Sequence, residues 1–264
     1  MEVALFITCL TDNFFPRVGE AVVRVLRHFG CRVVFPAEQT CCGQPAYTAG
    51  ELARVDDLAR RMIRIFEPYE CVVTPSASCA AMVLHHYTEV LAQDPLARRA
   101  AESLAARTHE FGVFLSQTLG IDVAALLKLS EPATYHWPCH ARHVYSPEEL
   151  RTLLAGGDTS STTKPSPATV QSEIRPCAHD DMCCGFGGSF AVDFAETSAA
   201  MMRDRLAELS ATGARLVICN EGGCSLQLSG GAHRMGLPLR FRHVAELLAE
   251  SLGLMAPETQ ERNP

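Results

Sequence analysis

Cysteine is the residue type whose number and spacing could do chemistry in this chain. There are 12 cysteines among 264 residues, and two adjacent pairs, Cys41-Cys42 and Cys183-Cys184, are each followed by glycine. Adjacent cysteines cannot bond to each other without severe strain, and a reducing compartment disfavours structural disulfides. Each pair can instead offer two thiolates to one metal centre, so the sequence predicts metal binding or redox chemistry.

The same order of cysteines occurs twice. In each half a single cysteine comes first, an adjacent pair follows more than thirty residues later, and another single cysteine follows after a similar interval. Thiolates select soft metals, and ligands gathered from three distant segments favour an iron–sulfur cluster over a zinc site built from close C-x2-C pairs. We therefore predict two sets of metal ligands, one per half: Cys9, Cys41, Cys42 and Cys79, and Cys139, Cys183, Cys184 and Cys224.

Glycines follow both pairs and have a physical use beside a cluster. Gly43, and Gly185, Gly187 and Gly188, let the backbone approach closely and aim N–H groups at sulfur. We predict that these four glycines bind the cofactor. Tight turns without a ligand are the alternative.

The four other cysteines do not share the repeated pattern. Cys31 and Cys71 lie at the starts of apolar segments, where a free cysteine packs as a small hydrophobic residue, so we predict that both belong to the core. Cys177 and Cys219 have no counterpart in the first half, and we interpret neither as a ligand.

Histidines surround one of the predicted ligands. His136, His140 and His143 flank Cys139, but the haem-attachment motif C-x-x-C-H is absent, and we interpret His140 as at most a hydrogen-bonding neighbour of a ligand. The sequence also lacks a P-loop and a G-x-S-x-G motif. We identify no catalytic residue.

The elements that must position these cysteines alternate between strand and helix. In the first half we expect strands over 3–8, 33–35 and 71–74. A helix that begins at Pro16 and ends at Gly30 separates the first two strands, and a Thr48–Glu51 capping box begins another over 52–66.

The second half repeats this order with strands over 133–137 and 216–219 and a helix near 194–212. Each cysteine of the pattern is then expected in a loop after a strand, where open α/β sheets place their sites. The predicted fold is α/β, with two pseudo-repeated Rossmann-like lobes of short parallel sheets and flanking helices. The predicted divisions are a first cysteine-rich lobe, a helical connector, a second cysteine-rich lobe and a polar tail: 1–92, 93–130, 131–255 and 256–264. Residues 156–176, rich in Gly, Ser, Thr and Pro, are expected to be irregular.

Composition excludes several classes of partner. The chain is 47% hydrophobic and 20% charged, as in globular proteins, and its formal net charge of −7 disfavours nucleic acid and anionic lipid. The apolar run at 3–10 is too short for a signal peptide or a membrane span. We expect a cytoplasmic protein without a membrane span.

The cysteine motifs resemble a known family. FITCL at 6–10, TCCGQP at 40–45, TPSASCAAM at 74–82 and CCGFGG at 183–188 resemble the lactate-utilisation protein A family. This family shares the cysteine-rich CCG domain with the cysteine-rich component of heterodisulfide reductase and with glycolate oxidase iron–sulfur subunits. The resemblance implies an iron–sulfur electron-transfer subunit with two clusters, which works with the other subunits of a complex that oxidises L-lactate to pyruvate.

Two departures from the related patterns bear on the cluster type. Ser76 and Glu221 stand where heterodisulfide reductase has the first cysteine of a closing C-x2-C motif, and HWPCH at 136–140 replaces the usual HDSCH. Four pattern thiolates per half favour a 4Fe-4S cluster in each. Two such clusters can accept the two electrons of lactate in sequence.

Alternative functions stay open at this point. The chain carries no motif for a hydride acceptor, so we expect it not to oxidise lactate by itself. A heterodisulfide-reductase-like or glycolate-oxidase-like redox subunit is one alternative. A zinc-stabilised interaction module without redox function is another.

Overall fold

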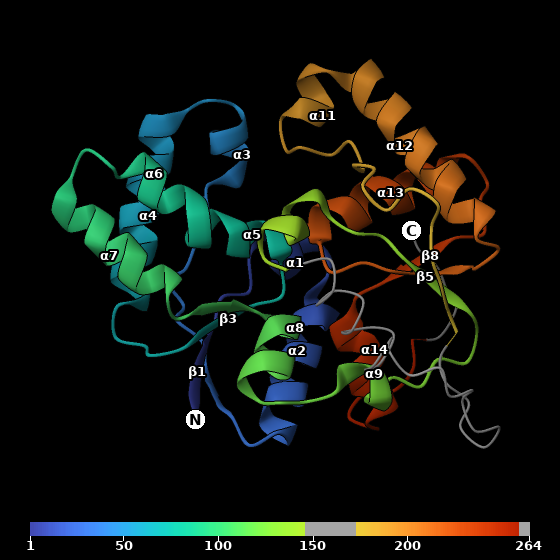
Figure 1. Cartoon of the computed structure of the whole chain (residues 1–264), viewed down its shortest axis with the longest axis horizontal. Helices are drawn as coiled ribbons and strands as arrows, with labels where there is room; N and C mark the ends of the chain where they lie inside the picture. Colours follow the sequence, from blue (N-terminus) through green and yellow to red (C-terminus); the bar gives the residue numbers. More distant parts are fainter. Residues whose placement is uncertain (146–172, 259–264) are drawn as a thin grey trace.

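Two four-stranded parallel sheets form the framework of the protein. The computed structural model describes residues 1–145 and 173–258, and Figure 1 shows the two halves as lobes side by side. The strand order is β2-β1-β3-β4 in one sheet and β6-β5-β7-β8 in the other, so the second lobe repeats the topology of the first. The strands are β1 (Glu2–Leu5), β2 (Arg32–Val34), β3 (Val72–Thr74), β4 (Thr108–Glu110), β5 (Ala133–Tyr135), β6 (Ile174–Arg175), β7 (Leu216–Ile218) and β8 (Arg240–Arg242). The predicted α/β fold with two repeated lobes is confirmed.

Strand pairing brings the functional segments to one edge of each sheet. Val3 lies opposite Val33, Ala4 opposite Val72 and Thr74 opposite Glu110 in the first sheet, and all neighbours run parallel. The second sheet is parallel throughout as well. The carboxyl ends of the strands, from which the cysteine segments leave, therefore share an edge in each lobe.

Helices of the first lobe cover both faces of its sheet. Helix α2 begins with Pro16 at its first position and ends before Gly30, whose φ of 81° stops the helix, as predicted. The predicted capping box is wrong, because Thr48 ends helix α3 and Glu51 caps α4 without a side-chain hydrogen bond. The helices are α1 (Cys9–Phe14), α2 (Pro16–His28), α3 (Gln44–Thr48), α4 (Leu52–Phe66), α5 (Ala77–Ala81), the π-helical turn η1 (Met82–His86), α6 (Tyr87–Val90) and α7 (Pro95–Ala105).

Three short strands, β4, β6 and β8, were not predicted from the sequence. Strand β4 lies within the segment expected to be a helical connector, and it extends the first sheet beside β3. Strand β6 lies at the end of the segment expected to be irregular, of which residues 156–172 fall outside the described residues. The division of the chain at residues 92 and 130 stays a prediction, and most of the predicted tail, 259–264, is also outside the described residues.

The remaining helices lie between residues 111 and 251. Helix α12 matches the predicted helix and ends before Gly213, whose φ is 70°. These elements are α8 (Phe111–Val113), the π-helical turn η2 (Phe114–Thr118), α9 (Val123–Leu126), the 3-10 turn η3 (Cys139–His143), α11 (Phe190–Asp193), α12 (Ala195–Ala211), α13 (Gly222–Arg234) and α14 (Val244–Ser251). No helix within the described ranges has both the length and the apolar character needed to cross a bilayer.

One hydrophobic core runs through both lobes. Helix α2 of the first lobe packs against α14 of the second, and side chains from β1, β3, β5 and β7 complete this shared core. Cys31 and Cys71 belong to it, as predicted. Two further clusters cover the outer faces of the sheets, one beneath α4 and α7 and the other beneath α12 and α13. The lobes therefore form one packed body, and a change at their contact is expected to reach both.

Candidate metal centres

The single cysteines of the pattern lie in the first turns of helices. Cys9 begins α1, Cys139 begins η3, and Cys79 and Cys224 lie at the third positions of α5 and α13. The expectation that every pattern cysteine lies in a loop is therefore wrong for these four and holds only for the adjacent pairs. Free backbone N–H groups at a helix N-terminus favour negative charge, so these positions suit thiolate ligands.

The first set of thiols forms a connected group. Hydrogen bonds from Cys42 and Cys9 lower the pKa of the Cys41 thiol to about 3, and the Gly43 N–H, 3.4 Å from its sulfur, acts in the same direction. Hydrogen bonds with Cys41 and Cys79, together with burial, raise the pKa of Cys42. These hydrogen bonds favour the thiolate form of Cys41, and they bring all four predicted ligands of this half together.

The second set has the same arrangement. Hydrogen bonds from Cys139 and Cys184 lower the pKa of Cys183 to about 2, and the Gly185 N–H lies 3.4 Å from the Cys183 sulfur. The Cys184 thiol donates to the Cys224 sulfur over 2.9 Å. The structure thus brings together both predicted sets of four thiols. That they bind metal stays a prediction.

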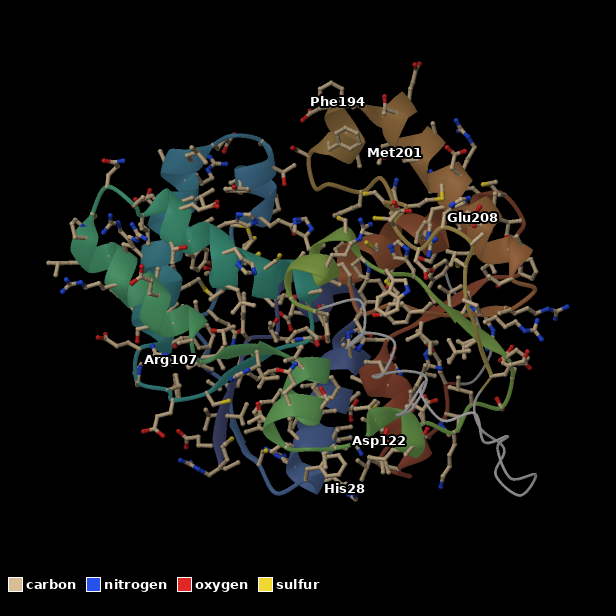
Figure 2. All side chains as sticks on the ribbon, viewed as in Figure 1. His28, Arg107, Asp122, Phe194, Met201 and Glu208 are labelled. Atoms are coloured by element: carbon tan, nitrogen blue, oxygen red, sulfur yellow. The ribbon has the colours of Figure 1, made fainter. Side chains whose placement is uncertain are left out.

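The predicted cofactor-binding glycines differ in their surroundings. Gly43 and Gly185 have φ angles of 90° and 81° and donate to the first sulfur of their pairs. A Cβ at Gly185 would lie 2.6 Å from the Ser198 carbonyl oxygen and 3.1 Å from the Cβ of Met201, which is labelled on α12 in Figure 2. Only glycine fits there without movement of the backbone.

The other two glycines of the second loop face protein side chains. A Cβ at Gly187 would lie 2.9 Å from Phe190, and one at Gly188 would lie 3.3 Å from Pro45 of the first lobe. Gly188 therefore packs across the contact between the lobes. A role of either residue in cofactor binding stays a prediction.

The two centres are linked through the N-termini of α5 and α13. The Glu221 carboxylate accepts hydrogen bonds from the Ser76 hydroxyl at 3.0 Å and the Ser78 N–H at 2.8 Å. All three residues are buried. Figure 1 shows α1, α5 and α13 near the centre of the molecule, and α1 contacts α13 as α5 contacts η3. The serine and glutamate that replace motif cysteines therefore join the helices that carry Cys79 and Cys224.

His136 lies beside the second set of thiols and was not predicted as a site residue. One of its ring nitrogens lies within 4.8 Å of the Cys184 and Cys224 sulfurs. Its Nδ1 accepts a hydrogen bond from Arg205 Nε at 3.0 Å, and its buried Nε2 has no hydrogen-bond partner among the described residues. Burial lowers the pKa of His136 to about 3, so the ring is neutral. The available sequence signal was its position at a strand end, three residues before Cys139.

The remaining candidates lie around this second centre. His140 Nδ1 is 3.5 Å from the Cys139 sulfur, which is the neighbouring position expected for it. Cys219 is hydrogen-bonded to Cys224 and donates to the Glu221 carbonyl oxygen. Cys177 lies 3.5 Å from the Thr134 hydroxyl. The interpretation that Cys177 and Cys219 are not ligands stays a prediction.

Comparison with known proteins identifies both cysteine-rich segments. The family described as "CCG: Cysteine-rich domain" matches residues 3–84 and 133–229, which include all eight predicted ligands. A lactate utilization protein A from Exiguobacterium sp. is 38% identical over 95% of this chain and 98% of its own length. Proteins of the same name from Halalkalibacterium halodurans and Bacillus pumilus are 37% and 39% identical, each over 94% of this chain and over 96% and 99% of their own lengths.

Proposed function

The chain belongs to the family of lactate utilization protein A and carries its cysteine-rich CCG domain twice, and on this premise we propose that it is an iron–sulfur electron-transfer subunit of a complex that oxidises L-lactate to pyruvate. The observation that carries the proposal is the meeting of four thiols in each lobe. The names of its relatives support lactate utilisation as the process.

The donor set of each lobe fits a 4Fe-4S cluster. Such a cluster is held by four cysteine thiolates, and when bound it takes up and passes on one electron at a time. Cys9, Cys41, Cys42 and Cys79 would hold one cluster. The ligands of the other would be Cys139, Cys183, Cys184 and Cys224.

The protein stabilises the negative charge of these thiolates in two ways. Backbone N–H groups of Gly43 and Gly185 donate to the sulfurs of Cys41 and Cys183. The single cysteines lie at helix N-termini, whose partial positive charge acts in the same direction. Ligation by four thiolates is therefore matched by donors that the fold already holds in place.

Each thiol set has a buried and a more accessible side. Cys42, Cys79, Cys184 and Cys224 are buried, whereas Cys9, Cys41, Cys139 and Cys183 are partly exposed. The buried side excludes water, and the accessible side gives an electron donor or acceptor a short approach. This asymmetry supports a relay between partner proteins, and the group that takes the electron pair from lactate is assigned to one of those partners.

The experiment that tests this function is reduction by L-lactate under argon. The purified chain with its bound iron and sulfide is mixed with L-lactate, with and without its candidate partner subunits, and the visible spectrum is followed. We expect no reduction by lactate alone and rapid reduction when the partners are present. Rapid reduction of the chain alone, after verified removal of flavin, would contradict the relay. A colourless protein that contains zinc would favour the zinc-stabilised module instead.

A further inference from the structure

The two lobes differ at one buried position next to the thiols. Phe6 lies three residues before Cys9, and His136 lies three residues before Cys139. Each follows an inner strand of its sheet, β1 or β5, and is fully buried. The first lobe therefore places an aromatic hydrocarbon where the second places an imidazole.

A second difference lies on the helix that covers this position. Four of the five buried residues of α12 repeat the spacing of the four buried residues of α4, and Leu206 is buried in addition. In this alignment Arg205 occupies the place of Met62. The matching residues are Val55, Ala59, Met62 and Phe66 in α4, and Ser198, Met202, Arg205 and Leu209 in α12. Phe6 and Met62 share one hydrophobic cluster, whereas His136 and Arg205 share a hydrogen bond of 3.0 Å.

Arg205 is held inside the second lobe by carbonyl oxygens, a ring nitrogen and the Cys177 sulfur, which lies 3.7 Å from Arg205 Nη2. It is fully buried and donates to the carbonyl oxygens of His179 at 2.7 Å and Tyr135 at 3.2 Å, besides His136 Nδ1. No carboxylate pairs with it within the part of the chain that the structure describes. A buried cation without a paired anion is costly, and a negatively charged group in the adjacent thiol set would compensate for it.

The hydrogen bond from Arg205 fixes the proton on His136. A guanidinium only donates, so the Nδ1 that accepts from it carries no proton, and the ring proton is on Nε2. This N–H is buried and has no acceptor among the described residues, and the ring lies beside the sulfurs of Cys184 and Cys224. A protonated nitrogen cannot ligate a metal, but it can donate to sulfur.

We propose that His136, held in this tautomer by Arg205, donates a hydrogen bond from Nε2 to the sulfur of the second centre and makes that centre easier to reduce than the first. The proposal rests on the function proposed above. An added electron makes the centre more negative, and a donated hydrogen bond and a nearby cation both stabilise that state. Phe6 and Met62 supply neither to the first centre. With clusters bound at both centres, this difference would favour the passage of one electron from the first centre to the second, with no bond made or broken.

The test is an anaerobic redox titration followed by EPR on the protein with its bound clusters. The double variant His136→Phe/Arg205→Met copies the pair of the first lobe, and it avoids leaving Arg205 buried without its partner. At the wild-type midpoint of the more easily reduced centre, we expect the ratio of reduced to oxidised centre to fall at least tenfold, which corresponds to 59 mV for one electron. Phe6→Leu is the matched control in the first lobe and should leave this midpoint unchanged.

Two further measurements separate hydrogen bonding from packing and do not depend on the double variant. His136→Gln keeps an N–H near the position of Nε2. Its second centre should therefore have a midpoint potential closer to that of the wild type than to that of the double variant. Pulsed EPR of the wild type with ¹⁵N-labelled histidine should show weak coupling to one histidine nitrogen and an exchangeable proton at the second centre.

The possible results distinguish this inference from the proposed function. If the protein holds two clusters but the double variant has unchanged midpoint potentials, this inference is overturned and the proposed function stands. Absence of histidine coupling in the wild type would have the same consequence. Strong ¹⁵N coupling of a directly bound imidazole would overturn it in favour of ligation. A protein without iron and sulfide would overturn the proposed function and this inference with it.

Discussion

Replacement of Glu221 by alanine tests whether the link between the two centres stabilises the protein. The carboxylate accepts hydrogen bonds from Ser76 Oγ at 3.0 Å and the Ser78 N–H at 2.8 Å in the first lobe. It also accepts from the Gly223 N–H at 3.4 Å at the start of its own helix. Glu221→Ala would leave these donors buried without that acceptor.

The magnitude follows from the number of donors and their burial. Hydrogen bonds to charged groups contribute about 1.5–3 kcal/mol each, and a buried donor left without its acceptor costs about 1–3 kcal/mol. We take about 4 kcal/mol for Glu221→Ala, which at about 2–4 °C per kcal/mol lowers Tm by about 8–16 °C. Glu221→Gln keeps the shape and one acceptor oxygen, so its expected cost is smaller, about 1–2 kcal/mol.

The assay is anaerobic thermal unfolding of the protein with its clusters, together with the iron that each variant retains. Glu221→Ala should also release iron more readily from both centres, because α5 and α13 carry Cys79 and Cys224. The matched control is Glu102→Ala, which removes an exposed helical pair with Arg98 and should leave Tm unchanged. If Glu221→Ala behaved like this control, the reasoning about the link between the lobes would be refuted.

Three further predictions concern single residues. Cys9→Ser should lower bound iron by about half and leave the spectrum of the second cluster recognisable, because each lobe supplies its own ligands. Burial raises the pKa of Glu110 from its ordinary 4.5 to about 8, so the stability from its protonated form is complete below about pH 4.5 and is lost as the pH rises through about 8. Glu110→Gln should remove this pH dependence, whose slope in the free energy of unfolding is at most about 1.4 kcal/mol per pH unit and which is followed through Tm. Gly185→Ala should cost about 2–3 kcal/mol and Gly43→Ala about 1 kcal/mol in thermal unfolding, because the nearest contact of a new Cβ is 2.6 Å at Gly185 but 3.5 Å at Gly43.

Each of these predictions has an outcome that contradicts it. Loss of both clusters from folded Cys9→Ser protein would indicate one shared site. An unchanged dependence of Tm on pH in Glu110→Gln would show that this carboxyl does not keep its proton in the folded protein. Equal costs at Gly43 and Gly185 would show that the loop moves away from Ser198 at little expense.

Local sequence signals were sufficient for the repeated parts of the fold. Pro16 and Gly30 bound one helix, the spacing of apolar residues predicted most of α4, and Gly213 ends α12. The repeated order of cysteines selected the thiols that the structure brings together. These signals succeed because each depends on neighbours in the chain or on a pattern that occurs twice.

The missed features depend on contacts between distant parts of the chain. Strands β4 and β8 have three residues each and β6 has two, and pairing with β3, β7 and β5 defines them more than their own sequences do. The partner of His136, Arg205, is 69 residues away, and Ser76 and Glu221 are 145 residues apart. No local pattern reports such pairs, because only folding brings them together.

The measurement that tests the central claim most directly is iron and acid-labile sulfide analysis of the chain purified without oxygen, with EPR of the reduced protein. The account predicts about eight iron and about eight sulfide per chain, and EPR signals from two clusters of different midpoint. Zinc without sulfide, or iron for a single cluster in a folded wild-type chain, would contradict it.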